Sequence, residues 1–99
     1  MTTDFSELQQ RVMQNKKNHN FNTTDIKFEL LVLYGEVNEL FQAWLKDDSD
    51  NLKEEIADIQ IYLLGIAEML NIDLGKETLN KMAINEKRVY QNGKKTISE

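Results

Sequence analysis

Two pairs of acidic residues are placed where they could bind a metal ion. Glu36 and Glu39 are three residues apart in one predicted helix, and Glu55 and Asp58 repeat this spacing in the next. Residues three apart are neighbours on a helix surface, so an antiparallel hairpin could bring the four carboxylates together. Such a group repels itself unless a cation neutralises it. Mg²⁺, with Mn²⁺ as a substitute, fits because it accepts a few carboxylate oxygens and completes its shell with water and phosphate.

The alternative explanation is an ordinary solvated helix face, on which most charged residues lie. At about 100° per residue, however, the acids form a band beside the apolar stripe of each helix instead of opposite it. Glu55 lies within about 50° of the apolar stripe, and Glu39 lies furthest from it. Glu54 falls on the solvent side. This placement of the acids favours a metal site but does not indicate which reaction the site would catalyse.

A second group of residues could bind phosphate. Lys81, Asn85 and Arg88 are spaced i, i+4 and i+7 on the last predicted helix and therefore share one face. Compensation of the helix dipole near a C-terminus is the alternative role for these cations. Phe21, in a predicted loop, could stack on a nucleobase, and Trp44 either does the same or continues a core stripe.

The composition removes several classes of protein. The 99 residues include no Cys and one His, which excludes disulfide frameworks and thiolate zinc sites and argues against His-rich metal sites. The 17 acids against 12 bases argue against binding of nucleic acid polymers. No apolar run is long enough for a membrane span, and the polar start does not resemble a signal peptide. We expect one cytoplasmic domain over residues 1–99, with residues 94–99 as a polar tail.

The periodicity predicts four helices, because apolar residues recur every three or four positions and the chain has no Pro. The first two helices are expected over about residues 4–18 and 24–46. The third should be capped by a residue within 47–50 and run to about residue 70, and the fourth should cover about residues 74–91. Thr23 or Thr24 is expected to cap the second helix, Asp73 the fourth, and Asn92-Gly93 to end the fourth. Residues 59–70 are apolar on nearly every side, which predicts that a partner subunit covers part of this helix.

Several runs resemble MazG-like all-α nucleoside triphosphate pyrophosphohydrolases, most closely the short single-domain group that includes dCTP pyrophosphatases. The similarity covers about residues 24–90, and the matching runs are Leu33–Leu40, Glu54–Ile59, Ile61–Leu64, Ile72–Leu74, Lys81–Met82 and the pair Asn85 and Arg88. Asn38 departs from the pattern, since glycine is more common at that position. The resemblance implies an all-α four-helix bundle completed by dimerisation, as a homodimer or a tetramer.

The resemblance also implies Mg²⁺-dependent hydrolysis of a nucleoside triphosphate to the monophosphate and pyrophosphate, as part of nucleotide-pool house-cleaning. The two acidic pairs would hold the metal, and Lys81, Asn85 and Arg88 would meet the phosphates. Glu39 would take a proton from the attacking water. The alternatives are a related pyrophosphatase acting on dUTP or phosphoribosyl-ATP, or a non-catalytic helical dimer that senses a nucleotide.

Overall fold

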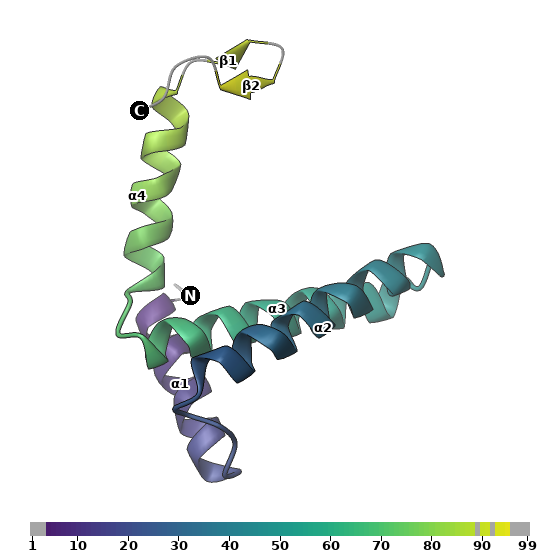
Figure 1. The fold of residues 1–99 in the computed structure, drawn as a ribbon, viewed down its shortest axis with the longest axis vertical. Coiled ribbons are helices and arrows are strands. Elements are labelled where there is room, and N and C mark those ends of the chain that lie inside the picture. Colours follow the sequence, from purple (N-terminus) through teal and green to yellow (C-terminus); the bar gives the residue numbers. More distant parts are fainter. Residues whose placement is uncertain (1–3, 89, 92, 96–99) are drawn as a thin grey trace.

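The protein is built almost entirely of helices, as Figure 1 shows for a computed structural model that describes residues 4–88, 90–91 and 93–95. The elements in chain order are α1 (Phe5–Asn18), α2 (Ile26–Leu45), α3 (Ser49–Met69), α4 (Leu74–Lys87), β1 (Tyr90–Gln91) and β2 (Lys94–Lys95). The two short strands pair as an antiparallel hairpin. The predicted all-α class is therefore confirmed. None of the described helices is long and apolar enough to cross a membrane.

Every helix begins after an aspartate whose carboxylate accepts a hydrogen bond from a backbone N–H of the first turn. These N-caps are Asp4, Asp25, Asp48 and Asp73. Asp73 was expected, whereas the expected cap of α2 at Thr23 or Thr24 is wrong. The side-chain oxygen of Asn22 accepts from the backbone N–H groups of Thr24 and Asp25, and this turn moves the helix start to Ile26.

Three helices end in left-handed residues other than glycine. Asn20, Asp47 and Asn71 follow α1, α2 and α3 with φ of 55°, 55° and 57°. In each case the next residue donates its N–H back into the last turn, as Ile72 does to the carbonyl of Ala67 over 2.8 Å. Asn and Asp tolerate this conformation better than other residues with a Cβ. The connections between the helices are consequently sharp and hydrogen-bonded.

The fourth helix is shorter than the sequence predicts. It ends at Lys87, and Arg88 already has extended backbone angles, φ −70° and ψ 146°. The expected extension to Gln91 is wrong because Tyr90 and Gln91 form β1. Gly93, expected as a helix C-cap, instead lies in the hairpin turn with φ 77°.

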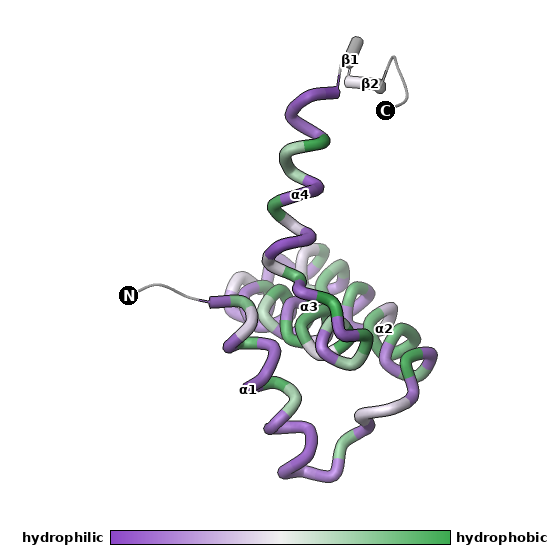
Figure 2. The backbone as a smooth tube through the Cα atoms, turned by 90° about the vertical axis from the view of Figure 1, so that its left-hand side faces the viewer, coloured by the Kyte–Doolittle hydropathy of each residue, from purple (hydrophilic) through white to green (hydrophobic). Residues whose placement is uncertain are grey.

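The core is the contact among α1, α2 and α3. Helices α2 and α3 form an antiparallel hairpin, and α1 packs across the C-terminal half of α3 (Figures 1 and 2). At the crossing, a Cβ added to Gly65 would lie 3.3 Å from Val12 Cγ1, so glycine permits the close approach of α1 and α3. Leu64, Ile66 and Ala67 are buried there.

Much of the predicted apolar stripe has no cover within one chain. On α2, Leu30, Val37, Phe41 and Trp44 are 45–68% exposed. Within the segment expected to be buried all round, residues 64–67 are buried but Ile61 is 48% exposed. A patch of this kind on a small protein marks an interaction surface. Coverage by a partner subunit stays a prediction.

Helix α4 does not join the other three. It leaves the end of α3 and projects away from the α2–α3 hairpin (Figures 1 and 2). Its contacts are mainly with α1, and none of the residues 74–87 is buried. A single chain therefore forms a three-helix core with a projecting fourth helix, and completion of a four-helix bundle by a second chain stays a prediction.

Candidate metal and nucleotide site

Three of the four predicted metal ligands come together between α2 and α3. Glu36 and Glu39 from α2 and Glu55 from α3 each offer a carboxylate oxygen within 4.8 Å of the other two. We call these three residues the carboxylate cluster. The i, i+3 spacing on α2 and the antiparallel packing of α3 produce the arrangement that the sequence predicts.

The carboxylate cluster runs from the core to the solvent. Glu55 is buried, Glu36 is half-buried and Glu39 is exposed, in agreement with the predicted places of Glu55 beside the apolar stripe and of Glu39 furthest from it. One buried oxygen of Glu36 and one of Glu55, both Oε2, have no hydrogen-bond partner. Buried carboxylate oxygens without a partner are costly, so this pair of atoms indicates a missing positive ligand.

The pKa of the Glu36 carboxyl is raised from 4.5 to about 7. Burial is the largest cause, followed by the adjacent carboxyl group of Glu55 and then by the negative charges of the neighbouring acids, with Glu39 first. All of these causes penalise a negative charge on Glu36. A bound cation would reverse the penalty, because it favours the ionised form.

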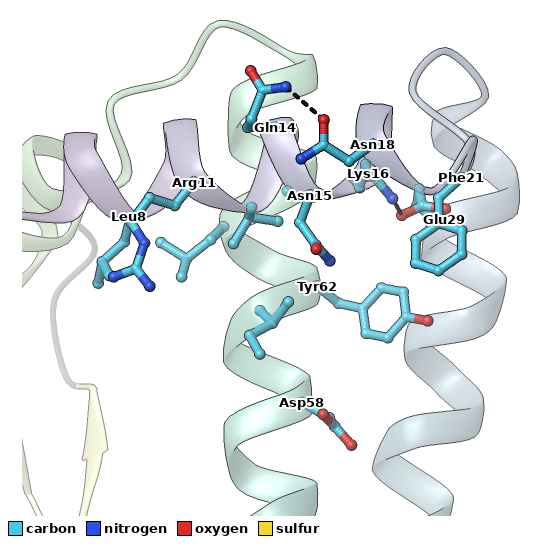
Figure 3. Close-up of a pocket in the computed structure, with 14 residues that line it drawn as sticks. Leu8, Arg11, Gln14, Asn15, Lys16, Asn18, Phe21, Glu29, Asp58 and Tyr62 are labelled. Atoms are coloured by element: carbon cyan, nitrogen blue, oxygen red, sulfur yellow. Dashed lines mark hydrogen bonds and ion pairs between the residues drawn. The ribbon is translucent and has the colours of Figure 1, made fainter.

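Asp58, the fourth predicted ligand, is exposed and lies outside the carboxylate cluster. It is three residues beyond Glu55 on α3 and faces a neighbouring cavity (Figure 3). Tyr62, one turn further on, lines the same cavity and lies close enough to the acids for their charges to affect its hydroxyl. Burial is the largest cause that raises the pKa of its hydroxyl, followed by the charges of Glu36 and Glu29.

The cavity has a volume of about 790 Å³ and lies between α1, α3 and the start of α2. Its lining is mixed: apolar residues from α1 and α3, the aromatic residues Phe21 and Tyr62, and polar residues that include Arg11 and Asn15. Figure 3 shows Asn15 projecting from α1 toward Tyr62, with Asp58 further along α3. A planar ring held here would have aromatic and amide groups beside it and carboxylates at one end.

A buried ion pair forms one wall of this cavity. Lys16 Nζ donates to Glu29 Oε1 over 2.5 Å, and both side chains are nearly inaccessible to solvent. Asn22 donates to the second oxygen of Glu29 over 3.1 Å and to the backbone carbonyl of Asp25 over 2.8 Å. These bonds tie the α1–α2 loop, which carries Phe21, to the helices on both sides.

The predicted phosphate-binding residues are not near the carboxylate cluster of the same chain. We call Lys81, Asn85 and Arg88 the α4 trio. Lys81 and Asn85 lie on the projecting helix, and Arg88 is its C-cap and donates to the side-chain oxygen of Asn85 over 3.1 Å. Phe21 lines the cavity, whereas Trp44 is 68% exposed near the end of α2 and is not among the lining residues; a stacking role for either stays a prediction.

Several residues at this site were not identified from the sequence. Asn15, Tyr62 and the Lys16–Glu29 pair carry no distinctive local motif. The partners of the ion pair are 13 residues apart in different helices. Glu29 belongs to the band of acids beside the apolar stripe of α2, and this position was the one feature of the sequence that indicated its burial.

The residues present suit Mg²⁺. The ligands are hard oxygens, two of them are buried without a partner, and the exposed side at Glu39 leaves room for water and phosphate. The protein is therefore an all-α protein with a candidate metal site beside a cavity that could hold a ligand. The sequence model of the MazG-like family matches residues 25–99, and the chain belongs to that family.

Named relatives share part of the sequence. dCTP pyrophosphatase 1 of Homo sapiens is 36% identical over 72 residues, covering 60% of this chain and 42% of the relative. The Rattus norvegicus protein of the same name is 35% identical over the same shares. A dATP/dGTP diphosphohydrolase of Salmonella phage PMBT28 is 54% identical over 37 residues, 37% of this chain and 13% of the relative. The chain thus spans less than half the length of these relatives. No solved structure matches it significantly.

Proposed function

We propose that this protein is a Mg²⁺-dependent nucleoside triphosphate pyrophosphohydrolase. It would cleave a (d)NTP to the (d)NMP and pyrophosphate and so remove unwanted nucleotides from the cytoplasmic pool. The observation that carries the proposal is the carboxylate cluster, with two buried oxygens that lack partners, beside a cavity with aromatic and amide groups. The names of the relatives, which include a dCTP pyrophosphatase and a dATP/dGTP diphosphohydrolase, support the same reaction class.

Each acid has a distinct role in this proposal. Glu36, Glu39 and Glu55 hold Mg²⁺, and Asp58 adds a carboxylate from the cavity side. When bound, the metal supplies charge neutralisation for the triphosphate and activation of water. Glu39 accepts the proton of the attacking water, because it is the exposed member of the carboxylate cluster and the one that solvent reaches. The anhydride bond between the α- and β-phosphates breaks, and pyrophosphate leaves.

The cavity receives the base. Phe21 and Tyr62 offer aromatic surfaces, and the amide of Asn15 can both donate and accept a hydrogen bond. One relative is named for a pyrimidine nucleotide and another for purine nucleotides, so their names do not point to one base for this chain. The α4 trio meets the phosphates, and the protein acts as a homodimer or a tetramer that covers the exposed face of α2.

The test is incubation with a panel of all common NTPs and dNTPs in Mg²⁺, with chromatographic identification of the products. We expect monophosphate and pyrophosphate from at least one member of the panel. Glu39→Gln should lose turnover while its helical content is unchanged. Glu54→Gln, which removes the same charge from an exposed position on α3, should remain active. Diphosphate with orthophosphate as products, or nucleotide binding without turnover, would contradict the proposal.

A further inference from the structure

One end of the cavity holds a buried cation with unused hydrogen-bond donors. Lys16 is 8% exposed and lines the cavity, yet its ammonium group makes one hydrogen bond within the described part of the chain, to Glu29. An ammonium group carries three N–H donors and no acceptor. Buried donors are paired in nearly all folded proteins, so the two that remain indicate an acceptor that these residues do not supply.

The carboxylate beside Lys16 already has donors on both oxygens. Glu29 is 3% exposed, and its Oε1 accepts from Lys16 while its Oε2 accepts from Asn22 over 3.1 Å. The charges of Lys16 and Glu29 cancel, so the ion pair gives a phosphate no net attraction. The unused donors therefore suit a neutral acceptor, such as a carbonyl oxygen, better than an anion.

The Lys16 side chain is held by all three core helices. It starts on α1, and its ammonium group bonds to Glu29 on α2. Its stem passes over Gly65 on α3, where an added Cβ would lie 3.8 Å from Lys16 Cδ and 3.9 Å from Cε. A donor fixed in this way discriminates between ligands, because it cannot turn away from a mismatched one without losing its buried partner.

An aromatic ring lies at the same end of the cavity. The backbone N–H of Phe21 donates to the carbonyl of Lys16 over 2.8 Å, and Figure 3 shows Phe21 beside the Lys16–Glu29 pair. His19 stacks on the Phe21 ring with the centroids 5.4 Å apart. Phe21 is still 56% exposed, so ring surface remains for a ligand. A planar base that stacks on it lies at the same end of the cavity as the Lys16 donors.

The cavity also extends toward the acids. Asp58 lines it and precedes Gly65 by seven residues, which is about 10 Å along α3. A nucleotide can therefore have its base at Lys16 and its phosphates toward Asp58 and the carboxylate cluster, with the sugar between them.

We propose that Lys16, held by Glu29, is a specificity-determining residue that selects bases with a carbonyl oxygen at position 4 of a pyrimidine or position 6 of a purine. This selectivity rests on the proposed function, which places the base in the cavity. Lys16 offers donors only, so it bonds to a carbonyl oxygen but meets the amino group of cytosine or adenine with a second donor. The substrate class is then the nucleotides of uracil, thymine, guanine or hypoxanthine.

Two matched pairs of substrates test the proposal on the wild type. dUTP and dCTP differ at position 4, and dITP and dATP differ at position 6, in each case by a carbonyl against an amino group. In the pair that is hydrolysed faster, which distinguishes a pyrimidine from a purine site, we expect kcat/KM to be roughly 10–100-fold higher for the carbonyl member, as for one hydrogen bond from a charged donor. The 4-thio analogue of dUTP, or the 6-thio analogue of dITP, keeps the ring N–H but has sulfur as a weak acceptor, and should react more slowly than its parent.

A double variant separates recognition of the base from stability. Lys16→Met with Glu29→Gln removes the donors and the buried counter-charge together, and the ratio of kcat/KM within the pair should fall to about one. Lys17→Met removes the same charge from the next, exposed position and should keep the wild-type ratio. An ion pair with a structural role alone would change the unfolding midpoint and leave the ratio as it is. If circular dichroism shows that the double variant does not fold, the thio analogue decides.

Four results would overturn this selectivity while leaving the proposed function standing: a wild type that prefers the amino member or does not discriminate, a thio analogue as good as its parent, a wild-type ratio in the double variant, or a lost ratio in Lys17→Met. A wild type inactive on every nucleotide would refute the proposed function instead. Titration calorimetry with dUMP, dCMP, dIMP and dAMP then decides: tighter binding of the carbonyl member of a pair supports the role of Lys16, and equal or absent binding overturns it.

Discussion

Replacing Glu36 by Gln should stabilise the metal-free protein at alkaline pH. The folded state holds this carboxyl with a pKa raised from 4.5 to about 7, so folding opposes its ionisation. Between these two values the folded chain binds more protons than the unfolded chain, and stability therefore falls as pH rises. The wild type is not destabilised by Glu36 below about pH 4.5, and the destabilisation reaches its full size above about pH 7.

The magnitude follows from the shift. One pKa unit corresponds to about 1.4 kcal/mol, which sets an upper limit of about 3 kcal/mol. Glu36 is half-buried, and screening by solvent reduces the expected effect to about 1–2 kcal/mol. Since Gln keeps the shape and removes the charge, Glu36→Gln should recover this amount. For a domain of this size the gain corresponds to roughly 5–15 °C in melting temperature.

The assay is urea unfolding followed by far-UV circular dichroism, in EDTA and at one fixed protein concentration, over the range from about pH 4.5 to 8. Glu54→Gln is the control, because it removes the same charge from an exposed position next to the carboxylate cluster. The difference between Glu36→Gln and the wild type should be near zero at the acidic end and should grow with pH. A constant difference, or an equal gain in Glu54→Gln, would refute the reasoning.

Three further changes have defined outcomes. Mg²⁺ should raise the melting temperature of the wild type more than that of Glu55→Gln, and equal shifts would mean that the carboxylate cluster does not bind the metal. Lys16→Met should lower the free energy of unfolding by about 3–5 kcal/mol, because it leaves the Glu29 charge buried without its partner. Adding Glu29→Gln should restore much of the loss in chemical denaturation. If the losses of the two single variants simply add in the double variant, the reasoning is wrong. Gly65→Ala should be more favourable in a Val12→Ala background than in the wild type, because the shorter side chain removes the methyl group that the new Cβ would approach to 3.3 Å. An equal change in unfolding midpoint in the two backgrounds would refute the close approach.

The carboxylate cluster could be predicted from the sequence because its geometry is local. Two i, i+3 pairs on helices joined by a short loop leave few other arrangements once the hairpin closes. The positions of Glu55 beside the apolar stripe and of Glu39 furthest from it also followed from the angles around each helix. Asp73 as an N-cap was equally local, since it depends only on an aspartate before a helical run.

The features that could not be predicted depend on contacts between distant residues. The direction of α4 is set by Gln9, whose partners lie 59 to 65 residues away and include backbone atoms that carry no sequence signal. The sharp turns at Asn20 and Asn71 rest on left-handed backbone that glycine usually marks, so a search for glycine does not find them. Nothing local distinguishes the buried Lys16 from an exposed helical lysine.

The α2–α3 hairpin of the single chain has two unsatisfied features among the described residues: carboxylate oxygens without partners and an apolar face without cover. A stable domain of this size has only a small margin of free energy, so deficits of this kind are retained where binding relieves them. Under the proposed function, a metal ion would satisfy the carboxylate oxygens and a second chain would cover the apolar face. Because both features lie on the α2–α3 hairpin, the proposal predicts that metal binding and assembly are coupled there, and it gives three of the 17 acids a role beyond the solvated surface.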